Sequence, residues 1–142
     1  MNKQVKVLLL WGLAIVAIST VGVSGCREYD PDLIGAWRLD HGGGCYEYLI
    51  FTDSGTLADA WGNSACGEDN GYTGVATYTV NTSVTPHQMD IAGTEVGHVL
   101  AVYEVSGDTL KIASSEAPNP RPTGFTDDDC DYCDYDEFVR LP

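Results

Sequence analysis

The sequence predicts an all-β fold, a small eight-stranded up-and-down barrel. Three observations support this prediction. Short segments rich in Val, Ile, Thr, Tyr, Phe and Trp recur along the chain, glycine and aspartate interrupt them, and almost no stretch has helical periodicity. Eight strands joined as neighbours can close into a barrel that leaves no unpaired edge, and a two-sheet sandwich is the main alternative.

The expected strands follow one another at short intervals. They span residues 33–39, 46–52, 56–61, 73–80, 87–91, 98–105, 109–113 and 135–141. Two compact turns, Asp53-Ser54-Gly55 and Ser106-Gly107-Asp108, contain the glycine that supplies a positive φ angle. Apolar residues occur on both faces of some strands, which indicates a thin barrel partly covered by loops. Because the strands are short, we expect a mostly filled interior.

The order of the strands predicts which connections lie together, because alternate connections of an up-and-down barrel share an end. The connections near Asp53, at 81–86 and at Ser106 should share one end with both chain termini. The connections after Asp40, Gly62, Gly93 and Ser114 should share the other end.

The first 26 residues have the features of a bacterial lipoprotein signal peptide. Lys3 and Lys6 precede an apolar run at 7–23, which ends in the lipobox-like Val23-Ser24-Gly25-Cys26. This run is shorter than the roughly 20 residues that a spanning helix needs, and glycine, serine and threonine interrupt it. The sequence therefore predicts a signal peptide at 1–25, acylation of Cys26, a tether at 26–32 and one domain at 33–142. The alternative is an ordinary signal cut near Gly25, which leaves Cys26 as a free thiol.

The mature chain is strongly acidic. The whole sequence has 7 Lys and Arg against 21 Asp and Glu, and the signal peptide holds two of the basic residues and none of the acidic ones. Its net charge is therefore about −16, which disfavours nucleic acid and anionic headgroups as partners and favours cations.

Four cysteines remain beyond Cys26: Cys45, Cys66, Cys130 and Cys133. An even number in an exported domain predicts two disulfides, and three pairings are open. All four lie in or beside the longer connections that should share one end, so any pairing can close. A zinc site on Cys130-x-x-Cys133 is the rival interpretation, although only one such pair occurs and an oxidising compartment favours disulfides.

Two stretches resemble lipocalin-like domains of unknown function in bacterial secreted proteins and lipoproteins. Leu33-Ile34-Gly35-Ala36-Trp37 is similar to their Leu-x-Gly-x-Trp opening. The stretch from Ala101 to Ile112, followed by Arg121-Pro122-Thr123-Gly124-Phe125, is similar to their end. The resemblance implies a lipocalin-like barrel and no agreed enzymatic activity. It also implies a Trp–Arg pair, for which Arg140 would lie over Trp37, while Gly35 would let a neighbouring segment approach the first strand.

The segment 126–137 is unusually acidic. Asp127, Asp129 and Asp131 alternate as calcium ligands do, but Tyr132 and Phe138 replace the glycine and glutamate that an EF-hand requires. A solvated acidic loop is the expected interpretation, with a looser calcium site as the alternative and no other cofactor. The three histidines, His41, His87 and His98, should not converge, because His87 lies near the opposite end.

No catalytic constellation occurs in the sequence: it contains no Gly-x-Ser-x-Gly elbow, and nothing singles out a pair of carboxylates. We therefore expect a non-enzymatic, membrane-anchored binding module for a small ligand or an envelope partner. An acidic module that binds or inhibits a basic envelope protein, by analogy with lysozyme-inhibiting barrel lipoproteins, is the alternative. The lipid would hold the domain in the cell envelope, facing the periplasm or the exterior. Arg27 after the acylated cysteine favours the outer membrane in a diderm bacterium.

Overall fold

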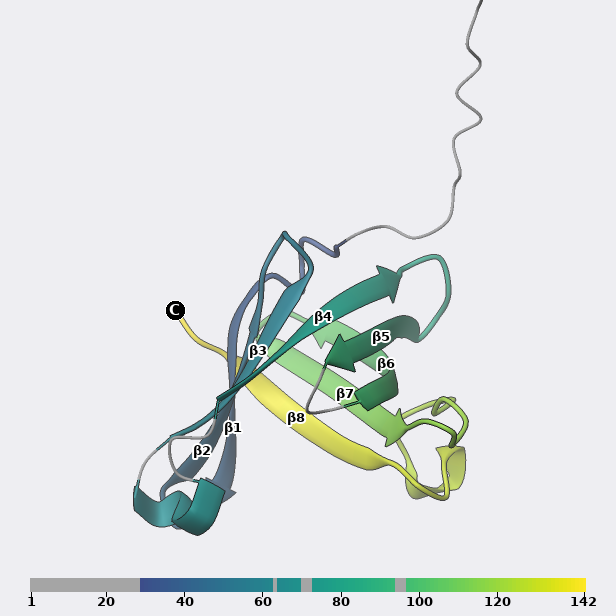
Figure 1. The fold of residues 1–142 in the computed structure, drawn as a ribbon. Coiled ribbons are helices and arrows are strands. Elements are labelled where there is room, and N and C mark those ends of the chain that lie inside the picture. The colour runs from purple at the N-terminus through teal and green to yellow at the C-terminus, as the bar shows by residue number, and fades with distance from the viewer. Residues whose placement is uncertain (1–28, 63, 70–72, 94–96) are drawn as a thin grey trace, which may run out of the picture.

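The computed structural model describes residues 29–62, 64–69, 73–93 and 97–142. They form a closed antiparallel barrel in which each strand pairs with its neighbours along the chain and β1 pairs with β8 (Figure 1). The strands are β1 (Gly35–Gly42), β2 (Cys45–Phe51), β3 (Thr56–Gly62), β4 (Thr73–Asn81), β5 (His87–Gly93), β6 (Gly97–Ser106), β7 (Thr109–Glu116) and β8 (Asp134–Arg140). The predicted fold class, an all-β eight-stranded up-and-down barrel, is confirmed.

Each predicted segment overlaps one observed strand, and the largest differences have local causes. β1 begins at Gly35 because the amide of Leu33 donates to the carbonyl of Asp30 at 3.0 Å, which makes a turn before the strand. β7 continues to Glu116 because Ser114 and Ser115 pair with β6. Their polar side chains gave no strand signal, yet backbone pairing extends the sheet through them.

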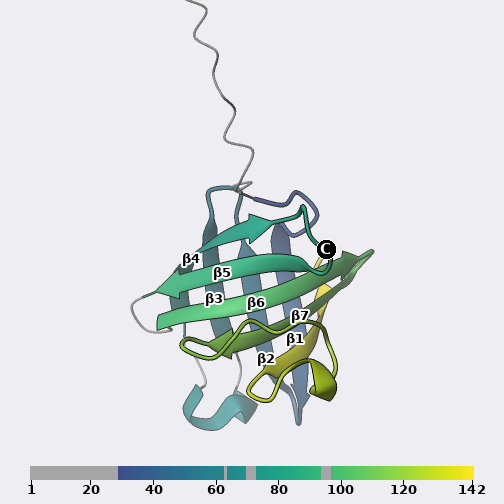
Figure 2. The same ribbon diagram turned by 90° about the vertical axis from the view of Figure 1, so that its right-hand side faces the viewer.

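The barrel has two distinct ends. β2, β4 and β6 finish at what we call the proximal end, where the described chain also begins and finishes. β1, β3, β5 and β7 finish at what we call the distal end, together with two short 3-10 helices, η1 (Ser64–Asp69) and η2 (Asp127–Asp129). Figure 2 shows η1 and the loop after β7 at the end opposite to the start of the described chain.

Inward and outward residues alternate most regularly along β4. Along β4, Gly74, Ala76, Tyr78 and Val80 point inward and are buried, while the residues between them are exposed. The buried core cluster contains Leu33, Trp37, Leu49, Phe51, Leu57, Ala76, Tyr78, Val80, Met89, Ile91, Ala101, Tyr103, Leu110, Ile112 and Phe138. Its largest fully buried members, Trp37, Tyr103 and Phe51 among them, concentrate toward the proximal end.

The seam between β1 and β8 is short. These two strands pair only at Trp37–Arg140 and Arg38–Val139 in the described structure, whereas β6 and β7 pair from Val99–Glu116 to Ser106–Thr109. Figure 1 shows β1 and β8 separating toward the distal end. The barrel is therefore tightly closed near its proximal end and splayed at its distal end.

A loop covers part of the outer surface, as the two-sided apolar pattern predicts. Arg121 in the β7–β8 connection donates from Nη1 to the carbonyls of Met89 at 2.7 Å and Ala101 at 2.6 Å, and it also pairs with Asp90. This anchor holds the connection against the outer side of the sheet, where Val102 is buried, and Figure 2 shows the connection passing along β7. Among the described residues, neither helix has the length and apolar character needed to cross a bilayer.

Candidate functional site

Trp37 and Arg140 meet at the proximal end. The Arg140 guanidinium lies 4.1 Å from the centroid of the fully buried Trp37 ring. Its Nη1 donates to the carbonyl of Ile34 at 2.9 Å, while the Trp37 indole donates to the carbonyl of Leu33 at 2.9 Å. Gly35 allows this close approach, because a Cβ atom there would lie 3.1 Å from the guanidinium and its φ is +133°. The structure thus brings together the three motif residues that the sequence singled out.

A second proximal contact joins the start of the domain to the core. Asp30 is 7% exposed, and its Oδ2 accepts a 2.8 Å hydrogen bond from the hydroxyl of the fully buried Tyr103. His87 Nδ1 lies 3.5 Å from the same oxygen, and the amide of Asp32 donates to Oδ1. Burial and the Asp30 carboxylate raise the pKa of Tyr103 far above its ordinary value. Both carboxylate oxygens of Asp30 therefore have a hydrogen-bond donor, and the contact fixes the segment that leads from the tether into β1.

The distal half of the barrel contains a cavity of about 140 Å³. The expectation of a mostly filled interior therefore holds for the proximal half and is wrong for the distal half, where the strands splay apart. Apolar side chains form the deeper wall: Leu49, Leu57, Ala76, Ile91, Val99, Ile112 and Phe138. Such a concave, largely apolar space is the usual form of a small-molecule site.

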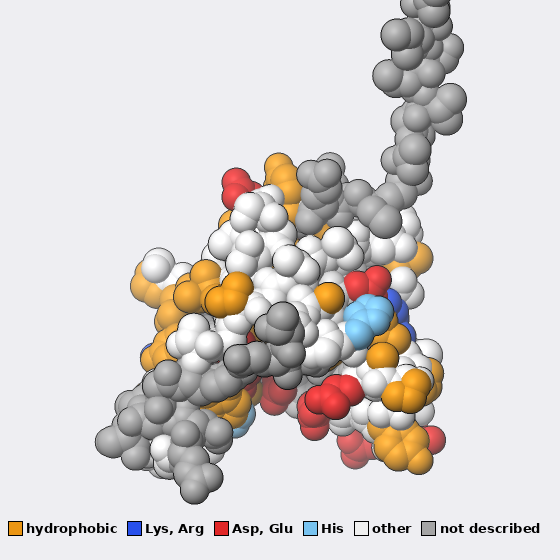
Figure 3. Space-filling model, viewed as in Figure 1, with side chains coloured by type: hydrophobic (Ala, Val, Ile, Leu, Met, Phe, Trp, Pro, Cys, Tyr) orange, Lys and Arg blue, Asp and Glu red, His pale blue; other side chains and the backbone are white. Residues whose placement is uncertain are grey.

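Three carboxylates lie on the distal side of this wall. Each is two residues away in sequence from an apolar wall residue on the same strand, so the two side chains point to the same interior. Glu47 precedes Leu49 on β2, Asp59 follows Leu57 on β3, and Asp136 precedes Phe138 on β8; Ser114 follows Ile112 on β7 in the same way. We call Glu47, Asp59 and Asp136 the carboxylate ring. Figure 3 shows acidic side chains gathered on the underside of the molecule, between the β1–β3 arm and β8.

Burial dominates the electrostatics of the carboxylate ring. It raises the pKa of Glu47 above 4.5 and those of Asp59 and Asp136 above 3.8. Repulsion from Asp59 and Asp136 raises the pKa of Glu47 further, whereas the hydrogen bond with His41 acts in the opposite direction. Burial therefore makes the ionised form of each of these groups less favourable than it would be in water.

Asp59 is the least satisfied member of the ring. A hydrogen bond from Trp61 lowers the pKa of its carboxyl group, against the larger effect of burial. Its Oδ1 atom, however, is shielded from solvent and has no hydrogen-bond partner among the described residues. A buried carboxylate oxygen without a donor is energetically unfavourable and is uncommon in folded proteins.

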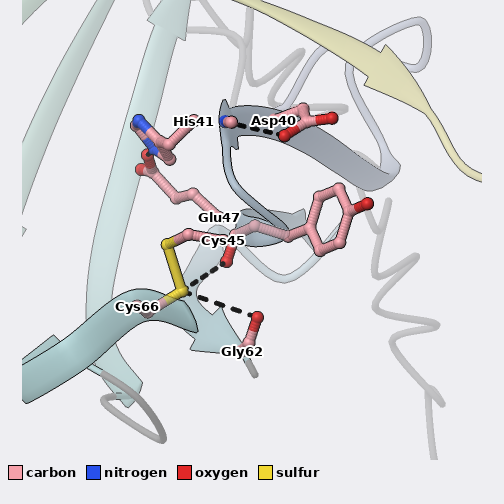
Figure 4. A network of polar contacts seen from close by, with 8 residues as sticks. Asp40, His41, Cys45, Glu47, Gly62 and Cys66 are labelled. Carbon is pink, nitrogen blue, oxygen red and sulfur yellow. Dashed lines mark hydrogen bonds and ion pairs between the residues drawn. A yellow bond between two sulfur atoms is a disulfide. The ribbon is translucent and has the colours of Figure 1, made fainter. Parts of the chain in front are cut away.

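His41 borders the ring at the end of β1. Its Nε2 lies 2.8 Å from Oε2 of Glu47, and Figure 4 shows the two side chains directed toward each other. The imidazole also stacks on Trp61, with ring centroids 4.6 Å apart and an interplanar angle of 18°. His41 therefore touches the cavity rim, whereas His87 lies at the proximal end and His98 is exposed on β6. As predicted, the three histidines do not converge.

Both predicted disulfides are formed, and both lie at the distal end. Cys45 at the start of β2 pairs with Cys66 in η1, with Cα atoms 4.7 Å apart, and Figure 4 shows this bridge beside Glu47 and Gly62. Cys130 pairs with Cys133 immediately before β8, with Cα atoms 5.7 Å apart. Because both members of Cys130-x-x-Cys133 are in this disulfide, the structure contradicts the rival zinc interpretation of that pair.

The acidic segment contains no ion-binding geometry. Asp127 and Asp129 lie in η2, and the Asp129 carboxylate caps it by accepting from the Thr126 amide at 2.9 Å and the Thr126 hydroxyl at 2.7 Å. These bonds lower the pKa of Asp129. Asp131 is exposed. Across the described ranges, no three His, Cys, Asp or Glu side chains gather as metal ligands would, so the calcium alternative at Asp127, Asp129 and Asp131 gains no support.

The predicted signal peptide and Cys26 lie outside the described residues. Comparison with protein-family models finds no family that matches the chain, and neither a curated protein nor a solved structure matches it.

Sequence reasoning did not identify the carboxylate ring. The signal was present as a two-residue offset from an apolar position on each of three strands, namely Glu47–Leu49, Leu57–Asp59 and Asp136–Phe138. The chain has 21 acidic residues, so many carboxylates lie two residues from an apolar one. These three could be singled out only once the strands were known to surround one interior.

Proposed function

We propose that the protein is a membrane-anchored, non-enzymatic binding module that holds one small ligand in the distal cavity. The observation that carries this proposal is the cavity itself, with an apolar wall below and ionisable groups above. A site of this kind orients a ligand, because the apolar part of the ligand packs on the wall while its polar part contacts the ionisable groups.

The lipoprotein features of the first 26 residues support the anchor. The Val23-Ser24-Gly25-Cys26 stretch has the form of a lipobox. Only residues 27–29 lie between Cys26 and Asp30. Since Asp30 is held against Tyr103 at the proximal end, a lipid on Cys26 would place that end toward the bilayer. The cavity would then open away from the membrane, on the periplasmic or exterior side.

The lipocalin-like resemblance supports the same function. Lipocalin-like barrels close one end with a Trp–Arg pair, and here Trp37 and Arg140 close the proximal end while the other end stays hollow. This division leaves the distal half free for a ligand.

The anchor is tested by replacing Cys26 with Ser and fractionating cells that express either form. The unchanged protein is expected in the membrane fraction with a mass that includes acyl chains, and Cys26→Ser is expected in the soluble fraction. A membrane-bound Cys26→Ser protein, or an unmodified mature N-terminus, would contradict the anchor.

The ligand site is tested by filling the cavity. Ala76 lies in the cavity wall, where it pairs with Leu57 on the adjacent strand β3, so Ala76→Leu is expected to occupy the space with little effect on folding. Small aromatic probes should shift NMR signals of wall residues in the unchanged protein and should not do so in Ala76→Leu. Identical shifts in both proteins would place binding elsewhere.

A further inference from the structure

We infer that the cavity selects a small organic cation, a compact apolar body that carries one ammonium group. This inference rests on the proposed function and specifies its ligand class. Three features of the site carry it: the charge of its lining, the unpartnered oxygen of Asp59, and the size and character of its deeper wall.

The charge of the lining selects against anions and neutral polar molecules. Among the described residues that line the cavity, three are carboxylates and none is lysine or arginine. An anion would add a negative charge to a poorly solvated negative ring, whereas an ammonium group would compensate it. His41 is a basic side chain outside this lining, and its Nε2 already contacts Glu47 at 2.8 Å.

The unpartnered oxygen selects for a hydrogen-bond donor. Oδ1 of Asp59 is shielded from solvent and lacks a partner among the described residues, while Glu47 and Asp136 belong to the same lining. A primary ammonium has three N–H donors and no acceptor, so it can donate to Oδ1 of Asp59 while its charge is balanced by the neighbouring carboxylates. Binding would therefore remove an unfavourable feature of the unliganded barrel.

The deeper wall sets the size of the ligand. The volume of about 140 Å³ is close to the roughly 150 Å³ of an engineered apolar cavity that accepts benzene. Leu57, Ile112 and Phe138 offer aliphatic and aromatic contacts to such a body. The site therefore fits an amine with a single ring or a short branched chain.

The first test uses three probes that share one ring and differ in charge: benzylamine, benzyl alcohol and benzoate. Each is titrated into the mature chain in a neutral detergent at pH 7, with binding followed by calorimetry and by NMR shifts of wall residues. Benzylamine is expected to bind at least tenfold more tightly than benzyl alcohol, and benzoate is expected not to bind.

Two results would overturn the inference in different ways. If benzyl alcohol binds as tightly as benzylamine, the cation preference is wrong while the proposed cavity function stands. If none of the three probes binds, the proposed function itself is wrong. If calcium shifts the same NMR signals more strongly than benzylamine does, the inferred ligand is wrong and the site binds a metal ion.

A matched pair of variants separates the ring from general surface charge. Asp136 points into the cavity, and its neighbour Glu137 is exposed beside Tyr135 and Lys111. Asp136→Asn and Glu137→Gln each remove one negative charge from β8. Asp136→Asn, and likewise Asp59→Asn, is expected to weaken benzylamine about tenfold and to leave benzyl alcohol unchanged, whereas Glu137→Gln should change both by less than twofold. Equal losses from Asp136→Asn and Glu137→Gln would show long-range attraction without a site.

Discussion

The two ends of the barrel differ in how they are packed and stabilised. The proximal end is filled by packed side chains: Arg140 covers Trp37, and Asp30 accepts a hydrogen bond from the buried Tyr103. The distal end is hollow, holds three poorly solvated carboxylates and is tied by two disulfides. Packing therefore stabilises one half of this small domain, while two disulfides stabilise the other half against the cost of its cavity.

This division has a structural origin in the seam between β1 and β8. The two strands pair only near the proximal end in the described structure, so backbone hydrogen bonds cannot hold their distal portions together. The Cys45–Cys66 bridge ties β2 to η1 on one side of the splayed end, and Cys130–Cys133 closes a short loop before β8 on the other.

The largest expected effect comes from the long-range disulfide. Cys45 and Cys66 are separated by 21 residues, whereas Cys130 and Cys133 are separated by 3. Because a disulfide restricts the unfolded chain more when it closes a longer loop, replacing Cys45 and Cys66 by serine should lower the free energy of unfolding by about 3 kcal/mol. The matched change at Cys130 and Cys133 should lower it by roughly half as much. Urea unfolding measures both, and equal losses would contradict the chain-entropy explanation.

Arg140→Ala tests how much the contacts of Arg140 stabilise the proximal end. The change removes hydrogen bonds to the carbonyls of Ile34 and Asp32 and exposes the Trp37 ring, so we expect a loss of about 2 kcal/mol. For a domain of this size that corresponds to a fall in Tm of roughly 8 °C. Arg38→Ala is the control, because Arg38 lies on the exposed face of β1 at 4.9 Å from the Tyr46 ring. A similar fall for both variants would show that burial does not strengthen the Trp37 contact.

Tyr103→Phe tests whether the buried hydrogen bond holds the start of the domain. It leaves Asp30 without its 2.8 Å donor, and we expect a loss of roughly 1.5 kcal/mol together with faster amide exchange before β1. Tyr135→Phe is the matched control, since the hydroxyl of Tyr135 donates to Glu137 at 2.6 Å on the exposed side of β8. Its loss should stay below about 0.5 kcal/mol. If thermal unfolding shows the same change for both variants, the Asp30 contact has no special role.

The smallest expected effect is on the pH dependence of stability, which should come from the carboxylate ring at the distal end. The pKa values of Glu47, Asp59 and Asp136 are raised in the folded state, so the folded protein holds their protons more tightly than the unfolded chain does. Their contribution to stability is therefore full at low pH and declines as pH rises from the ordinary carboxyl pKa through the raised values. Above those values it stays lost.

The control for this prediction separates the ring from the general acidity of the chain. Asp59→Asn should flatten the decline in Tm between pH 4 and pH 7, whereas Glu137→Gln, which removes an exposed charge, should leave its slope unchanged. A slope that responds equally to both changes would assign the decline to surface repulsion.

Much of the fold was predictable because strand formation in this chain depends on local patterns. Gly55 and Gly107 adopt the positive φ angles that the two compact turns were expected to need. The alternation of connections placed all four cysteines at one end before their pairing was known. The pairing itself was not predictable, because three combinations satisfied the same topology.

The strand order, the two ends, the end that holds the disulfides and the excess of negative charge follow from residue type and spacing, so they could be predicted from the sequence. Three properties became visible only in the folded barrel: β1 and β8 separate beyond Trp37 and Arg38, a cavity remains there, and Glu47, Asp59 and Asp136 line it together. These properties depend on how far the strands curve and on where the last pair of strands meets. Strand curvature and closure arise from contacts between residues distant in the chain, such as Gly35 with Arg140.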